Sequence, residues 1–456
     1  MHSNPFQFTR LAKAYSDITR SAYRKDLMSH FGVLCYKGTG HLNPLIALSR
    51  KLISRGHRVT LFQEAELEDQ VRLQGLEFYS ISNVYKSVGK DQRNTLHNFC
   101  ANITPLSQVI ERIAYDMEIS LQEMPNVLTH TKVDVLVMDE IILTGPTIAQ
   151  VLNLPYFVIS TSLPHRFGWS VSNRTSGNRY PLYRASSLDN LLLQVSAFRT
   201  SGPIGRKLDD LRKSLRLEPI ARIMKDFPPL AHITQLPQCL DLPRSVLPED
   251  FHYTGPFVDQ LTRPSVKFPW NRLDDKPMVY ATLGTAGKEQ PSILRMIAEA
   301  CHEINLQLVV SLGGRSYTNM LEGLAGDALV VKDAPQLELL KKAALVITHG
   351  GLNTVLETLM EGKPMIAIPI AYDQPAVAAR LARQRVAVVL PIARLSCTQI
   401  RMAMTKVLRD PGYREVALKL QANIWATHGL ERAADLIEAG MKRAKEFSPK
   451  QSIATQ

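Results

Sequence analysis

Short apolar runs of strand length alternate with helical segments along the first half of the chain. A helix-period pattern with Leu45, Leu48 and Leu52 follows the first apolar run and stops at Gly56. We expect this helix to have Asn43 as its N-cap and Pro44 in its first turn. Because strands that alternate with helices form parallel sheets, the pattern predicts an α/β domain. The apolar runs lie at 31–36, 58–63, 133–140 and 156–160, with a helical segment at 147–153.

The same rhythm restarts after residues 254–277, a stretch with four prolines and no clear periodicity. Strand-like runs follow from residue 278 to about residue 370, separated by helical segments. Residues 163–210 and 225–250 are richer in Ser, Arg and Pro, and we expect loops and short helices there. A chain of 456 residues is also too long for a single core, which favours two domains.

We therefore predict two α/β domains joined by a linker. The N-terminal extension is polar and aperiodic, which favours a tail and leaves an amphipathic docking segment as the alternative. The predicted ranges are an extension at 1–27, a first domain at 28–255, a linker at 256–276, a second domain at 277–427, and a C-terminal helix with tail at 428–456.

The composition excludes several classes of protein. No apolar run reaches the length of a membrane span, and the N-terminus lacks the apolar core of a signal peptide, so we expect a cytoplasmic protein. The net charge of +12 favours anionic ligands and leaves peripheral contact with an anionic membrane open. The Lys and Arg residues are dispersed, which argues against nucleic acid. The five cysteines are scattered without metal-ligand spacing, so no metal site is expected.

Polar residues gather at the end of the apolar run "AALVITH", where His349, Gly350 and Gly351 precede a helical segment. In open α/β sheets, ligands bind at the carboxyl ends of the strands. A helix N-terminus there offers unpaired N–H groups to an anion, which suits a diphosphate. An ordinary Gly-Gly turn before a helix, with a packing histidine, is the alternative.

The order of the motifs narrows these alternatives. Pro335-Gln336, "HGG-x-NT" at 349–354, Glu357 and "P-x-x-x-DQ" at 369–374 follow one another. This succession resembles the C-terminal signature of the UDP-sugar-dependent glycosyltransferases of the GT-B fold, in the branch of the macrolide and carotenoid enzymes. The resemblance implies an α/β protein with two Rossmann-like domains whose parallel sheets face a central cleft.

The resemblance also implies a donor site in the second domain. Ala334 and Gln336 would flank the uracil, although Asp333 stands where the family often has an aromatic residue, which leaves the stacking partner open. Glu357 would accept hydrogen bonds from the ribose hydroxyls, and Asp373 and Gln374 would bind the sugar. The diphosphate would be held by His349, the backbone at Gly351, Asn353, Thr354 and, in the loop "LGT", Thr285.

The first domain would supply the acceptor and the base. His41, in "GTGHLNP", stands at the family's position for a general base, and a neutral imidazole suits that task. Asp139 ends an apolar run and could orient His41; Glu140 is its competitor, and Asp134 begins the same run at the opposite edge. Residues 80–105 and 163–205 would bind the acceptor.

The implied activity is inverting transfer of a sugar, glucose by default, from a UDP-sugar to a small lipophilic or aromatic alcohol. No DxD motif occurs, so we expect no metal and no cofactor; the UDP-sugar is a co-substrate. A monomer or weak dimer is expected. The alternatives are a GT-B sugar-nucleotide epimerase and a non-catalytic nucleotide-sugar-binding protein.

Overall fold

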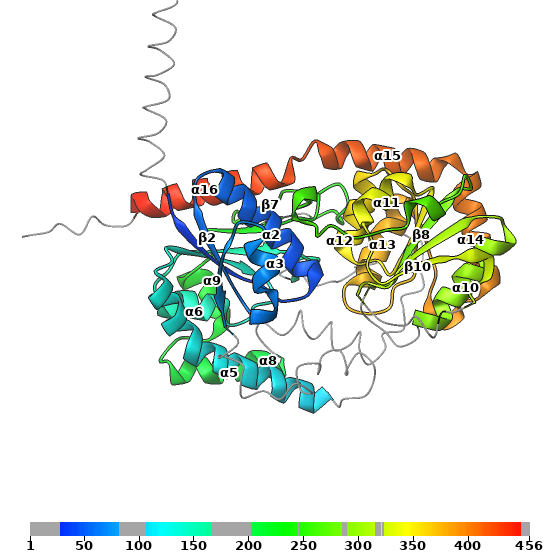
Figure 1. The fold of residues 1–456 in the computed structure, drawn as a ribbon. Helices are drawn as coiled ribbons and strands as arrows, with labels where there is room; N and C mark the ends of the chain where they lie inside the picture. The colour runs from blue at the N-terminus through cyan, green and yellow to red at the C-terminus, as the bar shows by residue number, and fades with distance from the viewer. Residues whose placement is uncertain are drawn as a thin grey trace, which may run out of the picture.

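The computed structural model describes residues 28–81, 106–165, 202–244, 246–284, 290–314, 321 and 323–447. These residues form two α/β domains that lie side by side, each built on a parallel sheet (Figure 1). The expected two-domain α/β architecture is therefore confirmed. The N-terminal extension predicted at 1–27 lies outside the described residues.

The first sheet has seven strands in the order β3-β2-β1-β4-β5-β6-β7, and neighbouring strands are parallel. The strand order reverses direction between β1 and β4, which makes the carboxyl ends of these two strands the place where a ligand is expected. The strands are β1 (His30–Leu34), β2 (Arg58–Gln63), β3 (Glu77–Ser80), β4 (Val135–Asp139), β5 (Tyr156–Ser160), β6 (Ala231–Thr234) and β7 (Phe251–Tyr253). The helices are α2 (Thr39–Ser54), α3 (Glu68–Arg72), α5 (Leu106–Thr131), α6 (Gly145–Val151), α8 (Pro203–Ser214) and α9 (Ile220–Asp226).

The second sheet has six strands in the order β10-β9-β8-β11-β12-β13, with the same reversal between β8 and β11. Its inner strands are buried over their full length, as parallel strands covered by helices on both faces should be. The strands are β8 (Met278–Thr282), β9 (Gln307–Ser311), β10 (Leu329–Val331), β11 (Leu345–Thr348), β12 (Met365–Ala367) and β13 (Ala387–Val389). The helices are α10 (Gln290–Glu303), α11 (Gln336–Lys342), α12 (Leu352–Met360), α13 (Gln374–Gln384), α14 (Cys397–Arg409) and α15 (Pro411–Trp425).

Helix α2 begins earlier than predicted. It starts at Thr39, with Gly38 in an extended conformation before it and no side-chain cap, so Asn43 and Pro44 lie inside the helix. The predicted N-cap at Asn43 is wrong, because the N–H groups of His41 and Leu42 already bond to the carbonyl of Gly38. Pro44 has no N–H, so it leaves the carbonyl of Gly40, four residues earlier, without its helical partner.

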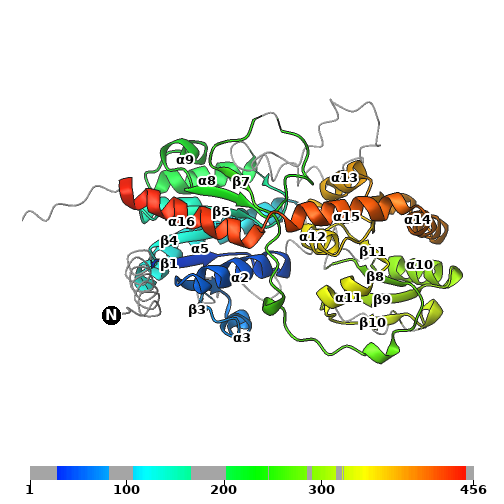
Figure 2. The ribbon, with the colours of Figure 1, turned by 90° about the horizontal axis from the view of Figure 1, so that it is seen from above.

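The C-terminal helices connect the two domains. Helix α15 packs on α12 in the second domain, whereas α16 (Gly429–Phe447) returns to the first domain and packs against α2 and β6 (Figure 2). Two glycines allow the chain to cross itself at this point. A Cβ on Gly429 would lie 2.5 Å from the carbonyl oxygen of Pro256, and one on Gly255 would lie 2.1 Å from the hydroxyl of Thr427.

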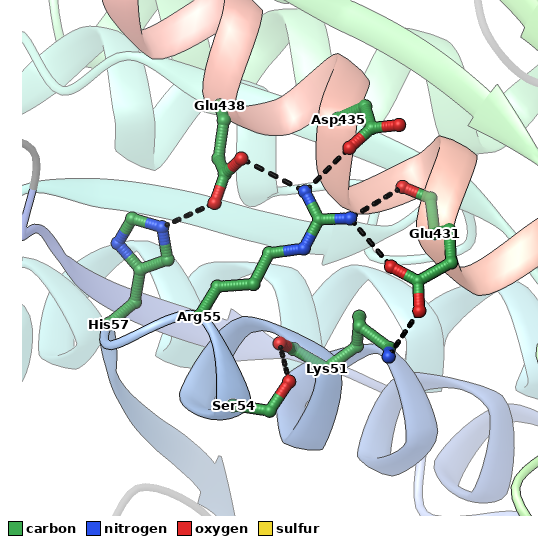
Figure 3. A network of polar contacts seen from close by, with 7 residues as sticks. All are labelled: Lys51, Ser54, Arg55, His57, Glu431, Asp435 and Glu438. Carbon is green, nitrogen blue, oxygen red and sulfur yellow. Dashed lines mark hydrogen bonds and ion pairs between the residues drawn. The ribbon is translucent and has the colours of Figure 1, made fainter. Parts of the chain in front are cut away.

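An ion-pair network joins α16 to the end of α2 (Figure 3). Arg55 donates to the carboxylates of Glu431 at 2.7 Å, Asp435 at 2.6 Å and Glu438 at 2.9 Å. Lys51 lies 2.5 Å from the second oxygen of Glu431. Because one guanidinium serves three carboxylates in the first half of α16, this arginine holds that part of the helix against the end of α2.

Replacing Arg55 with methionine should lower the free energy of unfolding by about 1–2 kcal/mol, because each of its partly exposed pairs contributes at most about 1 kcal/mol. Urea denaturation of the intact chain measures this change. Arg72→Met is the control, since Arg72 pairs with Glu68 within one helix and should cost less than about 0.5 kcal/mol. Equal losses in the two variants would contradict the role of Arg55.

Candidate active site

His41 lies in the first turn of α2, the helix that follows the carboxyl end of β1. Its Nδ1 donates to Oδ2 of Asp139 at 2.7 Å and lies 2.8 Å from the hydroxyl of Thr161, which itself donates to the same carboxylate oxygen at 2.9 Å. These bonds place the proton on Nδ1 and leave Nε2 with a free lone pair. The side chain of Asp139 is 1% exposed and that of His41 is 22% exposed, so the imidazole is the accessible member.

The surroundings of His41 change its basicity. Burial alone lowers the pKa of the imidazole, but the charge and hydrogen bond of Asp139, with a further contribution from Asp373, outweigh burial and raise that pKa above its ordinary value. A raised pKa makes His41 a stronger base and stabilises the imidazolium that proton uptake would form.

Glu140, the competing partner for His41, points into a different network. Its Oε2 accepts from the hydroxyl of Ser160 at 2.6 Å and from the N–H of His165 at 3.0 Å. His232 lies 2.7 Å from the same hydroxyl. These side chains are buried below the site, and the geometry assigns Asp139 to His41. Asp134 accepts from the N–H of His30 at the opposite end of the sheet, as predicted.

The imidazole of His349 occupies space that two glycines leave free. A Cβ on Gly351 would lie 2.5 Å from its Nε2, and a Cβ on Gly284 would lie 2.6 Å from the same atom. Gly351 comes from the loop after β11 and Gly284 from the loop after β8, on either side of the strand-order reversal. The glycines therefore leave room for the imidazole of His349.

His349 carries no charge at neutral pH. Burial lowers its pKa to about 4, against a smaller opposing effect of the carbonyl of Thr282, which lies 3.4 Å from Nδ1. In that contact, a protonated Nδ1 of His349 donates to the carbonyl oxygen of Thr282. To donate to a diphosphate, His349 needs the tautomer with its proton on Nε2, which gives up the contact with Thr282.

Asn353, in the first turn of α12, contacts the first domain. Its amide nitrogen donates to the carbonyl of Gly40 at 2.6 Å, and its amide oxygen accepts from Gln235 at 2.9 Å. The carbonyl of Gly40 is the one that Pro44 leaves without a helical partner. Pro44 of the first domain thus leaves the carbonyl of Gly40 free to accept a hydrogen bond from Asn353 of the second domain.

The carboxylate of Asp373 also reaches the first domain. Its Oδ2 accepts from the backbone N–H of Leu163 at 3.1 Å, in the loop after β5. Burial raises its pKa, although the Leu163 bond and the nearby His165 and His41 oppose that rise. Asp373 and His41, predicted from opposite halves of the chain, therefore lie close enough to influence each other's protonation.

Glu357 and Gln374 are both occupied by contacts within the protein. Glu357 is buried and accepts from Gln336 at 2.5 Å and from the guanidinium of Arg263. The amide oxygen of Gln374 accepts from the backbone N–H groups of residues 370 and 371, both at 2.8 Å, which fixes the loop before α13.

The chain is similar to known proteins over most of its length. The family model "UDP-glucoronosyl and UDP-glucosyl transferase" matches residues 227–441, and the model "Glycosyltransferase family 28 N-terminal domain" matches residues 33–137. Zeaxanthin glucosyltransferase from Pantoea ananas is 28% identical over 430 residues, which cover 91% of this chain and 96% of that protein. The chain belongs to the GT-B glycosyltransferases.

Solved structures show the same fold for this glycosyltransferase. The glycotransferase of kitacinnamycin superposes with a TM-score of 0.72 at 22% identity, covering 91% of this chain and 99% of that one. Glycosyltransferase VinC, solved in complex with dTDP, superposes with a TM-score of 0.64 at 16% identity, covering 91% and 100%. The expected GT-B fold is therefore confirmed.

Some predicted site residues of the glycosyltransferase are described only in part. Thr285 lies outside the described residues, as do most of the predicted acceptor segments, at 82–105 and 166–201. Ala334 is partly buried against the core of the second domain. The backbone oxygen of Thr354 accepts from the hydroxyl of Thr358 at 2.6 Å, inside α12. The roles of these residues stay predictions.

Three residues of the site were missed from the sequence. Thr161 follows β5 at the carboxyl edge of the sheet, so the strand-end rule that indicated the site at His349 could also have found it. Gln235 follows β6, a strand that was not predicted. Arg263 lies in the proline-rich linker, where nothing in the sequence indicates a contact with Glu357.

No helix in the described part of the chain combines the length and apolar character of a membrane span.

Proposed function

We propose that this glycosyltransferase moves glucose from UDP-glucose to a hydroxyl of a small lipophilic or aromatic acceptor, with inversion and without a metal. The observation that carries the proposal is the arrangement of His41, Asp139 and Thr161 at the strand-order reversal of the first sheet, next to Asp373 of the second domain. The arrangement supports the proposal because it would bring a base and a sugar-binding carboxylate to the same place.

In the proposed reaction, Nε2 of His41 takes the proton of the acceptor hydroxyl as its oxygen attacks the anomeric carbon. The bond from that carbon to the β-phosphate oxygen breaks, and UDP leaves with the electron pair. Displacement on the opposite face converts an α-linked sugar into a β-glycoside. Asp139 stabilises the imidazolium, which returns its proton to solvent after the product leaves.

The donor would lie along the carboxyl edge of the second sheet. The first-turn N–H groups of α12, which follow Gly351 as the N-cap residue, would hold the diphosphate. His349, Asn353 and Thr354 would assist there, Glu357 would bind the ribose, and Asp373 with Gln374 would bind glucose. Asn353 and Glu357 would have to exchange their present partners for the donor.

The nucleotide and the acceptor are supported by the relatives. The family model names UDP-glucosyl transfer, and the Pantoea protein is named for zeaxanthin, a lipophilic alcohol. The kitacinnamycin protein is likewise named for a natural product. These names support a lipophilic hydroxylated acceptor for this chain.

A donor and acceptor screen with mass-spectrometric detection tests the proposal. UDP-glucose and dTDP-glucose are each incubated with a carotenoid diol, a macrolide and a flavonol, with and without EDTA. We expect a hexose-sized mass increase with UDP-glucose that EDTA leaves unchanged, and a β-anomeric NMR signal in the product. Epimerised UDP-sugar without an acceptor would indicate an epimerase, and donor binding without any product would indicate a non-catalytic protein; either would contradict the proposal.

A further inference from the structure

We propose that Arg263 competes with the ribose of the donor for the carboxylate of Glu357, and so sets how strongly this enzyme distinguishes ribose from deoxyribose nucleotides. The inference rests on the ribose-binding role of Glu357 given above. It adds a residue of the inter-domain linker, far from the donor motifs in sequence, to the determinants of nucleotide selectivity.

Both oxygens of the Glu357 carboxylate are occupied. Gln336 donates from its amide to Oε2 at 2.5 Å, and Arg263 donates from Nη2 to Oε1. The side chain of Glu357 is 2% exposed with these partners in place. The two hydroxyls of a ribose can therefore reach the carboxylate only if a present partner withdraws.

Gln336 is held from its other end. Its amide oxygen accepts from the hydroxyl of Tyr280 at 3.0 Å, and Tyr280 is fully buried on β8. Moving Gln336 would break its bond with the buried hydroxyl of Tyr280 as well as its bond with Glu357, so two hydrogen bonds would be lost together. Gln336 is therefore the fixed partner.

Arg263 is the partner that can leave. It follows the short 3₁₀ turn η4 (Gln260–Thr262) in the linker between the two domains, and its side chain is 26% exposed. Its Nε is buried and has no hydrogen-bond partner among the described residues. A guanidinium held by one terminal nitrogen, with a path to water, costs less to displace than Gln336.

The competition affects only nucleotides that need Glu357. A ribonucleotide binds after Arg263 withdraws, and its apparent affinity is reduced by the fraction of molecules in which the carboxylate is free. A nucleotide without ribose hydroxyls has no use for the carboxylate and binds with Arg263 in place. Arg263 therefore reduces the preference of the enzyme for ribonucleotides over nucleotides that lack the ribose hydroxyls.

Calorimetric titration of the full chain with UDP and with 2′,3′-dideoxy-UDP tests this inference. The quantity of interest is the Kd for dideoxy-UDP divided by the Kd for UDP. In Arg263→Met this ratio should rise about fivefold, since a partly exposed ion pair that must open reduces affinity by about that factor. The two ligands carry the same charge, so the lost cation affects both equally and cancels in the ratio.

Arg272→Met is the matched control, because Arg272 lies in the same linker and pairs with Asp327 at the surface. Its ratio should equal that of the wild type. Arg263→Lys, which keeps the charge but lacks the planar fork, should give an intermediate rise of about twofold. This conservative variant also serves if Arg263→Met does not fold.

The opposite results are informative. A ratio that falls in Arg263→Met would show that Arg263 supports ribose binding, and an unchanged ratio would show that it has no part in selectivity; either overturns the inference. Glu357→Gln tests the underlying assignment separately and should bring the ratio close to one. If Glu357→Gln keeps the wild-type ratio, the ribose role of Glu357 fails, whatever the Arg263 variants show.

Discussion

Replacing His41 with alanine should lower kcat by about 10³-fold and leave the Kd for UDP within about twofold of the wild type, as expected for loss of a general base. Nε2 of His41 is the one accessible basic atom of the His41–Asp139–Thr161 group, since Asp139 is 1% exposed and bonded to both partners. The donor residues lie in the second domain and should be unaffected. Steady-state kinetics and UDP titration of the same preparation measure the two quantities.

The pH dependence separates the base from its orienting partner. Transfer requires neutral His41, so the rate should rise with pH through the pKa of the imidazole, which Asp139 raises. In Asp139→Asn the raising charge is gone while burial, which lowers the pKa, remains. The rise in rate should therefore move to lower pH as kcat falls. A His41→Ala variant with wild-type turnover, or an Asp139→Asn profile shifted to higher pH, would contradict these roles.

The pairing of His41 with Asp139 could be predicted because the family resemblance indicates a base at His41 and the topology places the end of the neighbouring strand beside it. Both residues follow apolar runs of strand length, and the carboxyl ends of adjacent parallel strands meet at one edge of a sheet. The register of β1 with β4, in which Leu34 pairs with Met138, brings the two loops together. The choice between Asp139 and Glu140 then depends on the alternation of side chains along β4, which the sequence left open.

Other parts of the fold could not be read in the same way. Strand β6 has only four residues and includes the buried His232, whose partners are Ser160 at the end of β5 and Glu140 directly after β4. Strand β7 is shorter still, and β3 and α5 were also not predicted. A short strand stabilised by tertiary partners carries little periodicity of its own.

The start of α2 could also not be predicted from the local sequence. Asn43-Pro44 is a standard helix-start signal, yet the helix begins five residues earlier because Gly38 already accepts the first-turn bonds. What makes Pro44 tolerable inside the helix is a partner for the carbonyl of Gly40, and that partner is Asn353 in the other domain. No local pattern could reveal it.

The second large effect is expected at Asp241, which follows β6 and joins the first domain to α13. Its Oδ1 accepts from Nε of Arg380 at 2.9 Å, and its Oδ2 accepts from Tyr253 at 2.5 Å and Arg244 at 2.8 Å. The side chains of Asp241 and Arg380 are 1% and 2% exposed. Asp241→Asn should destabilise the protein by about 3–5 kcal/mol, because it leaves the Arg380 guanidinium buried without its counter-charge.

A double-mutant cycle separates this pair from general disturbance of the core. Arg380→Met should cost a similar amount, and the double variant should be more stable than the sum predicts, by about 1–3 kcal/mol, because the second change removes the orphaned charge. Urea denaturation of the four proteins at pH 7 measures each free energy. Strict additivity would show that the pair does not hold the domains together.

Acid should reduce the difference in free energy of unfolding between the wild type and Asp241→Asn. Burial raises the pKa of Asp241, but the charges of Arg380 and Arg244 and the bond from Tyr253 outweigh it and lower that pKa. The stabilisation is therefore complete above the pKa of an unfolded aspartate, about 3.9, and is lost as pH falls through the lower folded value. The wild type should approach the variant below about pH 4.

The consequence for the site follows from the position of Arg380. It lies on α13, which has Asp373 as its N-cap and begins at Gln374, and its Nη1 donates to the carbonyl of Ala376 at 2.9 Å. Releasing Arg380 should therefore loosen the sugar end of the donor site against His41, while the phosphate end on α12 keeps its place. We expect Arg380→Met to lower transfer more than it weakens UDP binding, because the two domains would no longer hold Asp373 and His41 at a fixed separation.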